Sequence, residues 1–511
     1  STRRVCRGEV LRCRGYRPDV PYALAVVAGL ALWVAFPPIG WGWTAIVGIV
    51  LLQVAALRAR SGKAALGIGA IFTVAWVAPF LSWLASVELG AWVGIVVVHL
   101  PVFAGYAWVV WMVREWPVAY RYLALAGGWV FTFLVLRWLP IFAFEWLDPG
   151  YTVAGWEAAR SAAAIWGATG WGVLLALAAS GLSIGLLDRR RTLAMGGLAV
   201  LAVGFITGAV VDERPVGETL DVTIVQGHPE CPTFPCTTSR AEITDLHLRM
   251  TEALEPGPDL VVWGESSTGF STDPGQNTAV AEAIAQETER LGAFLLLGSD
   301  RPAGPVNFVN ANLLFDPQGR IVGEYRKQHP VPFGEYLPAR GLLGDIYPFS
   351  RQPRDMIPGD GPVLFDLDGP TMGTVISFEG AFGRYAREHA ELGAQFLVVN
   401  TNEGSYEDDA AADQLIGMTA MRAAELGLDV VHAAVSGKST FITDGGVPGE
   451  ETASFVPAVL EGTITLREQP PTLYARWGDW LVTVALLVSG VGVVRQSVVW
   501  AASEERKPLE T

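Results

Sequence analysis

The sequence contains few charged residues: Asp, Glu, Lys and Arg make up 17% of its 511 residues, whereas 51% are hydrophobic. This composition is too apolar for an ordinary soluble enzyme of this length. The hydrophobic excess lies before about residue 212 and again from about 478 to 499, and the region between has the mixed composition of a soluble domain. The composition therefore excludes a wholly soluble protein and indicates a membrane protein with one inserted soluble domain.

Cysteine and histidine are scarce as well, which limits the metal chemistry that the chain can support. There are four cysteines and six histidines, and we find too few ligands with suitable spacing for a metal site. Cys6 and Cys13 lie near the start, whereas Cys231 and Cys236 belong to the motif C-P-T-F-P-C. If that motif lies outside the cytoplasm, a small structural disulfide would persist there.

Basic residues are outnumbered by acidic ones, 36 to 51, and the formal net charge is −15. The basic residues gather in connections between apolar segments, and the mixed region has no basic patch, which argues against nucleic-acid binding. Eight apolar segments approach the about 20 residues that a membrane-spanning helix needs. They lie near residues 20–37, 41–57, 64–86, 90–113, 118–139, 161–187, 193–211 and 478–495.

Arg and Lys occupy alternate connections of these eight segments. They occur before the first segment, between the second and third, between the fourth and fifth, between the sixth and seventh, and after the last. Because basic connections remain in the cytoplasm, we expect both termini in the cytoplasm and the inserted domain outside it. The predicted organisation is N-terminal transmembrane helices over 1–212, an extracytoplasmic catalytic domain over 213–476, and a C-terminal transmembrane helix with a cytoplasmic tail over 477–511.

Short β-rich runs alternate with helical stretches in the inserted domain. The runs at 259–264 and 394–400 are continuously apolar, as expected of strands that are covered on both faces. Further strands are expected at 221–227, 293–299, 311–316, 371–377, 429–435 and 439–443, and helices at 238–254, 278–291, 381–392 and 410–426. Strands that alternate with helices predict a layered α/β domain.

Three reactive side chains follow strands of this domain. Glu265 comes after a strand that ends at Gly264, Lys327 follows I-V-G-E-Y-R, and Ser377 ends the strand that begins at Thr371. Active sites of open α/β sheets gather beyond the carboxyl ends of strands, so we expect the three to converge. A base, a cation and a nucleophile suit covalent acyl transfer, with Ser377 as nucleophile, Glu265 as base and Lys327 as oxyanion stabiliser.

Other residues near these three have both functional and structural interpretations. Glu335 and Glu379 either orient Lys327 or relay a proton, and Glu379 alternatively stabilises a helix start as a first-turn acid. Ser377 itself is equally suited to be a helix N-cap. His329, two residues beyond Lys327, is the only histidine close enough in the sequence to be a candidate base for Ser377. These residues together, in this order and next to strand ends, indicate acyl-transfer chemistry more specifically than any one of them does alone.

The chain resembles the bacterial apolipoprotein N-acyltransferase family, a membrane-embedded branch of the nitrilase superfamily. The resemblance covers nearly the full length and rests on several motifs. They are F-P-P (36–38), F-E-W-L-D-P-G-Y (144–151), V-Q-G (225–227), V-V-W-G-E-S (261–266), K-Q-H-P-V-P-F-G-E-Y-L-P (327–338), M-R-A-A-E (421–425) and Y-A-R-W-G-D-W (474–480).

The resemblance implies a nitrilase-like α-β-β-α domain and an acyltransferase of the bacterial plasma (inner) membrane. It assigns Glu265 as general base, Lys327 as catalytic lysine, Glu335 as supporting glutamate and Ser377 to the place of a catalytic cysteine, followed by Phe378 and Glu379. It implies a phospholipid acyl donor and a diacylated apolipoprotein acceptor, whose N-terminal cysteine receives the chain on its α-amino group. It implies neither a metal nor another cofactor.

Serine at position 377 departs from the family pattern, because a hydroxyl needs a stronger base than a thiol. Three explanations remain: a natural branch that uses serine or uses this site differently, a natural branch that binds lipoprotein or phospholipid without turnover, or a cysteine enzyme altered to serine. The segment N-T-N-E-G-S-Y (400–406) also lacks the tryptophan found in many members. A membrane-tethered amidase acting on a small external amide is a further alternative.

Overall fold

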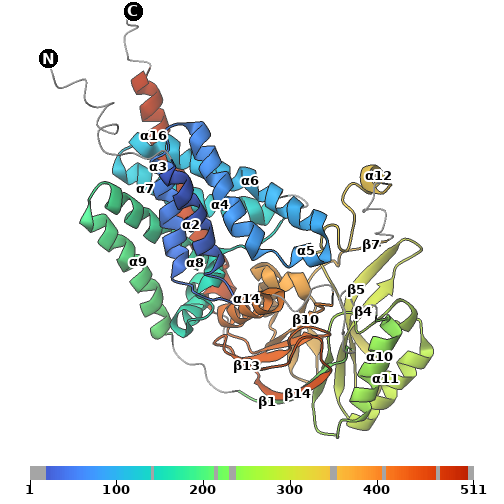
Figure 1. The fold of residues 1–511 in the computed structure, drawn as a ribbon. Coiled ribbons are helices and arrows are strands. Elements are labelled where there is room, and N and C mark those ends of the chain that lie inside the picture. Colours follow the sequence, from blue (N-terminus) through green and yellow to red (C-terminus); the bar gives the residue numbers. More distant parts are fainter. Residues whose placement is uncertain are drawn as a thin grey trace, which may run out of the picture.

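The computed structural model describes residues 19–139, 143–211, 217–228, 238–345, 354–404, 410–467 and 472–504. A helical bundle lies at one end of the molecule and two β-sheets lie at the other (Figure 1). All four cysteines, Cys6, Cys13, Cys231 and Cys236, lie outside the described residues, so the disulfide between Cys231 and Cys236 stays a prediction.

All eight predicted apolar segments form helices. They are α2 (Val20–Trp33), α3 (Thr44–Leu57), α4 (Gly62–Phe80), α6 (Leu89–Met112), α7 (Val118–Trp138), α8 (Glu157–Leu187), α9 (Arg191–Ala209) and α16 (Trp480–Glu504). Among the described residues, six of them are long and apolar enough to cross a membrane. The helices α2 and α3 have 14 residues each, which at about 1.5 Å per residue leaves them short of a hydrocarbon core of about 30 Å.

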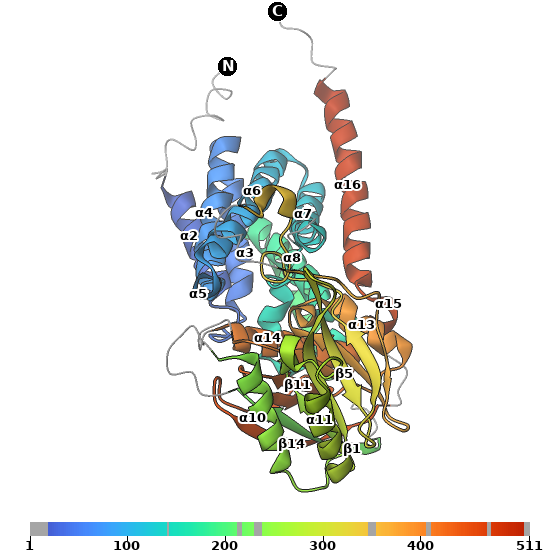
Figure 2. The same cartoon turned by 90° about the vertical axis from the view of Figure 1, so that its right-hand side faces the viewer.

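The chain is therefore a membrane protein with six full-length candidate spans and two shorter apolar helices, rather than eight equivalent spans. The predicted third span also ends early: α4 stops at Phe80, and the short helix α5 (Leu84–Val87) follows. The last helix, α16, runs along the side of the bundle (Figure 2). It brings the end of the chain back into contact with α7 and α8.

Two sheets form the rest of the fold. In the first, the strands β1 (Thr219–Gln226), β2 (Leu260–Trp263), β4 (Phe294–Pro302), β5 (Asn307–Phe315), β6 (Ile321–Arg326) and β14 (Ala458–Thr465) follow the order β14-β1-β2-β4-β5-β6. In the second, β8 (Phe365–Asp366), β9 (Thr371–Ile376), β10 (Phe396–Thr401), β11 (Val430–Ala434), β12 (Thr440–Ile442) and β13 (Pro448–Glu451) follow the order β13-β12-β11-β10-β9-β8. Short β3 (Thr268–Gly269) and β7 (Asp355–Met356) pair with β4 and β5.

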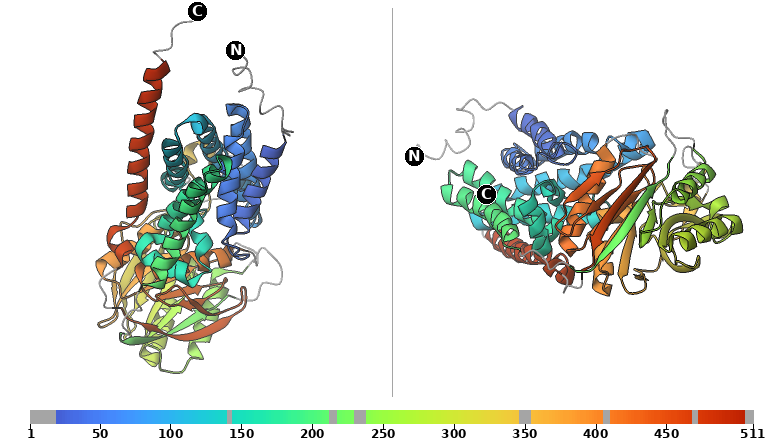
Figure 3. Two further views of the ribbon diagram at one scale, coloured as in Figure 1. Left: turned by 90° about the vertical axis from the view of Figure 1, so that its left-hand side faces the viewer. Right: turned by 90° about the horizontal axis from the view of Figure 1, so that it is seen from below.

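The two sheets pack face to face and carry helices on their outer faces, which confirms the predicted α-β-β-α layering (Figure 3). Apolar residues of both inner faces, such as Val262 and Val398, form one core cluster. On the outside of the first sheet, α10 (Arg240–Glu252) and α11 (Thr278–Leu291) cover residues such as Trp263.

The outer face of the second sheet is covered by α13 (Gly383–Leu392) and α14 (Ala410–Leu426). The helix α14 does not face solvent on its far side, because it packs against α8 of the bundle. A single apolar cluster continues from Val399 of the second sheet through Leu415 and Met418 of α14 to buried residues of the membrane helices. The helix α14 thus lies between the sheets and the bundle (Figure 1) and joins them into one core.

Candidate active site

Strand ends at one edge of the two sheets position the three predicted reactive residues. Glu265 follows β2 and Lys327 follows β6 in the first sheet, whereas Ser377 follows β9 in the second. The sheets touch at this edge, because a side chain added to Gly264 would meet the backbone of Val435 beyond β11 at 2.4 Å. The space beyond these strand ends is therefore shared by the two sheets.

Lys327 lies between two carboxylates. Its Nζ atom donates to Glu335 Oε1 at 2.5 Å and lies 3.5 Å from Glu265 Oε1. Asn310 Nδ2 donates to the same oxygen of Glu265 at 2.6 Å, and the other oxygen of Glu335 accepts from the backbone N–H of Val331 at 2.7 Å. Lys327 is 1% and Glu265 5% exposed, so the ammonium and the Glu265 carboxylate are held away from bulk water, whereas the Glu335 side chain is partly exposed.

Burial and charge determine the protonation of this group. Burial raises the pKa of Glu265, and the neighbouring Lys327 offsets part of that effect. Burial also lowers the pKa of Lys327, but Glu335 and Glu265 outweigh it and raise the pKa above its ordinary value. Lys327 therefore stays charged and suits the stabilisation of negative charge. Glu265, whose pKa is shifted toward neutrality, suits proton transfer.

Ser377 begins a 3₁₀ turn, Ser377–Ala381, and has a φ of 52°. This left-handed backbone conformation is uncommon for a residue other than glycine and is concentrated at functional sites. The residue is partly exposed. In the part of the chain that the structure describes, its hydroxyl makes no hydrogen bond, so neither Glu265 nor Lys327 is directly bonded to it.

Glu379 ties the Ser377 turn to the segment that carries Lys327. One of its oxygens accepts from the backbone N–H groups of Gln328 and His329 at 2.6 and 3.1 Å. The other accepts from the backbone N–H of Ile376 and from the Tyr325 hydroxyl, both at 2.9 Å. Burial raises the pKa of Glu379 to about 7, against the lowering effect of these donors. Glu379, which was predicted as an acid in the first turn of a helix, therefore also connects the ends of β6 and β9.

Aromatic rings surround the residue that follows the nucleophile candidate. The Phe378 ring stacks on Trp146 with centroids 6.0 Å apart and also contacts Phe144 at 5.6 Å. His329 lies 5.5 Å from Phe378, and its Nδ1 is 3.1 Å from the Tyr385 hydroxyl. Because Phe144 and Trp146 belong to the connection between α7 and α8, the membrane part contributes one wall of the site.

A polar chain links the same turn to a membrane helix. The Tyr151 hydroxyl donates to the carbonyl of Ala381 at 2.6 Å and accepts from Arg422 Nη2 at 3.3 Å. Arg422 pairs with Glu425 at 2.9 Å, and Glu425 accepts from the backbone N–H of Ala168 at 2.6 Å. Ala168 follows Gly167, where α8 is kinked. No local sequence pattern predicts these contacts, because their partners are up to 271 positions apart.

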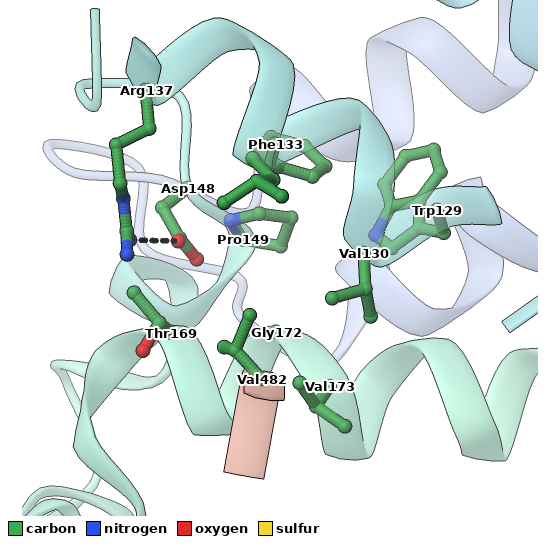
Figure 4. A pocket seen from close by; sticks show the side chains of 11 residues that line it. Trp129, Val130, Phe133, Arg137, Asp148, Pro149, Thr169, Gly172, Val173 and Val482 are labelled. Carbon is green, nitrogen blue, oxygen red and sulfur yellow. Dashed lines mark ion pairs between the residues drawn. The ribbon is translucent and has the colours of Figure 1, made fainter. Parts of the chain in front are cut away.

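A separate pocket lies between α7, α8 and α16 (Figure 4). Arg137 and Asp148 face each other at 3.9 Å on one side of it, and Arg137 also pairs with Glu145 at 3.0 Å and with Asp479. The remaining lining is largely apolar, including Trp129 and Phe133. This buried ion cluster joins α7 to the start of α16, and none of Glu265, Lys327 and Ser377 lines the pocket.

Two stacked sheets with an acid, an amine and a nucleophile candidate at their shared edge define a nitrilase-like domain, and here that domain is fused to membrane helices. Residues 221–448 match the carbon-nitrogen hydrolase family, and residues 28–181 match the apolipoprotein N-acyltransferase N-terminal domain. The chain belongs to the apolipoprotein N-acyltransferase family.

Similar proteins over the full length support this assignment. The apolipoprotein N-acyltransferase of Methylococcus capsulatus is 30% identical over 92% of this chain and 95% of its own length. Those of Mycolicibacterium smegmatis and Gloeobacter violaceus are each 28% identical, over 96% and 92% of this chain and 86% and 93% of their own lengths.

A crystal structure of an amidase from Nesterenkonia sp. superposes with a TM-score of 0.37 at 19% identity, over 52% of this chain and 94% of that one.

Proposed function

We propose that this protein transfers an acyl chain from a phospholipid to the α-amino group of the lipidated N-terminal cysteine of an apolipoprotein, through an acyl-oxyester on Ser377. The family membership supports acyl transfer to apolipoproteins. The observation that carries the proposed mechanism is the buried Lys327, held between Glu265 and Glu335 beside the turn that begins at Ser377.

In the proposed first step, Glu265 takes the Ser377 proton as the hydroxyl attacks the ester carbonyl of the lipid. Lys327 stabilises the negative charge on the tetrahedral intermediate, an interaction that gains strength where water is excluded. The lysophospholipid then leaves with the proton held by Glu265. In the second step the acceptor amine attacks the acyl-oxyester, and Ser377 is released with its proton restored.

The same proposal places residues 213–476 outside the cytoplasm, between transmembrane regions 1–212 and 477–511. Both substrates carry acyl chains, and moving such chains into water costs about 0.8 kcal/mol per CH₂ group. An active site whose wall includes Phe144 and Trp146 from the membrane part suits substrates that remain in the bilayer. The basic connections on the opposite side of the spans support this orientation.

A second candidate function is binding of lipoprotein or phospholipid without turnover. It is favoured by one observation: the Ser377 hydroxyl makes no hydrogen bond to Glu265 among the described residues, whereas an activated serine is normally bonded to its base.

An assay with a synthetic diacylated lipopeptide and phospholipid vesicles separates the two functions. The acyltransferase proposal expects triacylated product from the protein as it stands, a faster rate for Ser377→Cys and none for Ser377→Ala. Binding without turnover expects product only from Ser377→Cys. No product from any of the three proteins would contradict the acyltransferase proposal.

A further inference from the structure

A second buried carboxylate lies beyond the strand ends of the second sheet. Glu403 comes two residues after the end of β10, the strand between β9 and β11. The register pairs Ile376 with Asn400 and Thr401 with Ala434. Neighbouring strands are about 4.8 Å apart, so Glu403 stands one strand over from Ser377, on the same edge and slightly farther out.

Glu403 is buried without a partner. It is 3% exposed, and neither oxygen of its carboxyl group has a hydrogen-bond partner among the described residues. The carboxyl group packs on Gly437, where an added Cβ would lie 1.8 Å from one of its oxygens. A buried polar group without a partner is costly and is rare in folded proteins. A ligand that supplies a donor would remove this cost.

The groups that face Glu403 come from four neighbouring elements. Asp413 lies on α14, Lys438 follows β11, Glu265 follows β2, and His228 follows β1 near Gly404. Lys438 is itself paired with Asp413. Its backbone N–H favours the charged form of Glu403, although it forms no hydrogen bond to the carboxyl by distance and angle. Burial and the charge of Asp413 outweigh this and raise the pKa of Glu403 to about 8.

We propose that Glu403 binds the α-ammonium group of the acceptor and takes one proton from it; this inference rests on the proposed function. The ammonium group supplies the donors that the buried carboxyl lacks. An α-amino group has a pKa of about 7.7–8.0, close to that of Glu403. A proton therefore passes between the two with little change in free energy.

The proton balance of the transfer step follows from this arrangement. The ammonium gives one proton to the ionised carboxylate form of Glu403, and the neutral amine attacks the acyl carbonyl on Ser377. A C–N bond forms and the C–O bond to Ser377 breaks. Glu265 takes the second proton from nitrogen and returns it to the Ser377 oxygen, and Glu403 later releases its proton to water.

The first test compares the two half-reactions in Glu403→Gln and in the control Glu461→Gln, which changes an exposed residue of β14. Formation of the acyl-enzyme is followed with phospholipid alone, and its discharge is followed after addition of a diacylated lipopeptide. We expect Glu403→Gln to slow discharge at least ~10-fold more than formation. The loss in discharge rate caused by Glu403→Gln should be smaller at pH 10, where the amine is already neutral. Equal slowing of both steps, or a deficit independent of pH, would overturn the proposal.

The second test does not need turnover. In the Ser377→Ala background, binding of the lipopeptide is compared with that of an analogue in which hydrogen replaces the α-amino group. We expect the amine-bearing peptide to bind at least ~10-fold more tightly, and we expect Glu403→Gln to remove that preference. An unchanged preference would overturn the role of Glu403. If the unaltered protein forms no acyl-enzyme but Glu403→Gln removes the preference, only the proposed turnover fails.

Discussion

Lys327 shows how single residues set the chemistry of the site. A buried ammonium is stable here because two glutamates face it, at 2.5 Å for Glu335 and 3.5 Å for Glu265. The same contacts keep it charged, which suits the proposed role of a fixed cation rather than that of a base. The proposed site thus combines a cation that stays charged near neutrality with Glu265, a carboxylate whose pKa is raised by burial.

Replacing this cation is expected to damage both activity and stability. In Lys327→Met, Glu265 and Glu335 lose their common partner, and Glu265 remains buried. We expect acyl-enzyme formation to fall by about three orders of magnitude and the free energy of unfolding to fall by about 3–5 kcal/mol. Thermal unfolding in detergent and a single-turnover assay measure the two effects. Lys63→Met, at the start of the membrane helix α4, is the control. Activity of Lys327→Met within ~10-fold of the unaltered protein would contradict the assigned role.

The raised pKa of Glu403 predicts how stability depends on pH. Because its pKa rises from 4.5 to about 8 on folding, the folded state holds a proton more tightly than the unfolded state. The contribution to stability is therefore full below pH 4.5 and is lost as pH rises toward 8. Glu403→Gln removes this dependence, so its melting temperature relative to the unaltered protein should rise between pH 5 and pH 9. A difference that stays constant with pH would contradict a buried, titrating Glu403.

At the scale of elements, the helix α11 was predicted to its end residues, and local signals explain why. Asn277 accepts from the backbone N–H of Val280 and caps the start of the helix, and Gly292 ends it with a φ of 66°. The edge strand β14 was not predicted. The residues of β14 alternate in exposure and pair with β1 more than 200 positions earlier, so no apolar run marks them.

The candidate site was predictable only in part for a similar reason. Glu265, Lys327, Glu335, Ser377 and Glu379 lie in short motifs next to strand ends, and each of these positions can be read locally. The partners that hold them come from distant parts of the chain. Tyr151 reaches the carbonyl of Ala381 across 230 positions, and no local pattern in a single sequence reports such a contact.

The contact between Tyr151 and the turn Ser377–Ala381 predicts that its removal slows the reaction with little effect on folding. Tyr151→Phe keeps the buried ring but removes the hydrogen bond to Ala381 and the link to Arg422. One such bond contributes about 1 kcal/mol, so we expect acyl-enzyme formation to slow by about 10-fold with nearly unchanged lipid affinity. Tyr22→Phe, on the membrane helix α2, is the control. A loss of lipid affinity without a change in rate would contradict a positioning role.

At the scale of the whole molecule, the nitrilase-like part and the membrane helices share one core. The apolar cluster that includes Leu415 and Met418 of α14 continues into the bundle. At the kink of α8, the backbone N–H of Ala168 donates a hydrogen bond to Glu425 of α14. The soluble-type domain is therefore a part of one folded unit with the membrane helices, and not a module on a tether.

This shared core predicts that the catalytic region cannot stand alone. A fragment of residues 213–476 would expose the apolar surface of α14 that the bundle covers, and such large patches lead to association. We expect the fragment to aggregate or to require detergent, and to show no transfer even to a lipopeptide in micelles. Size-exclusion chromatography with the same assay tests this. A soluble, monomeric and active fragment would contradict the shared core and would favour a tethered amidase.

The central claim is that Ser377 carries the acyl chain. Mass spectrometry of the intact protein, followed by its peptides, after incubation with phospholipid and no acceptor, tests it most directly. We predict one added acyl mass on the peptide that contains Ser377, absent from Ser377→Ala and lost when a diacylated lipopeptide is added. Triacylated product formed by a protein that never carries an acyl group on Ser377 would contradict it.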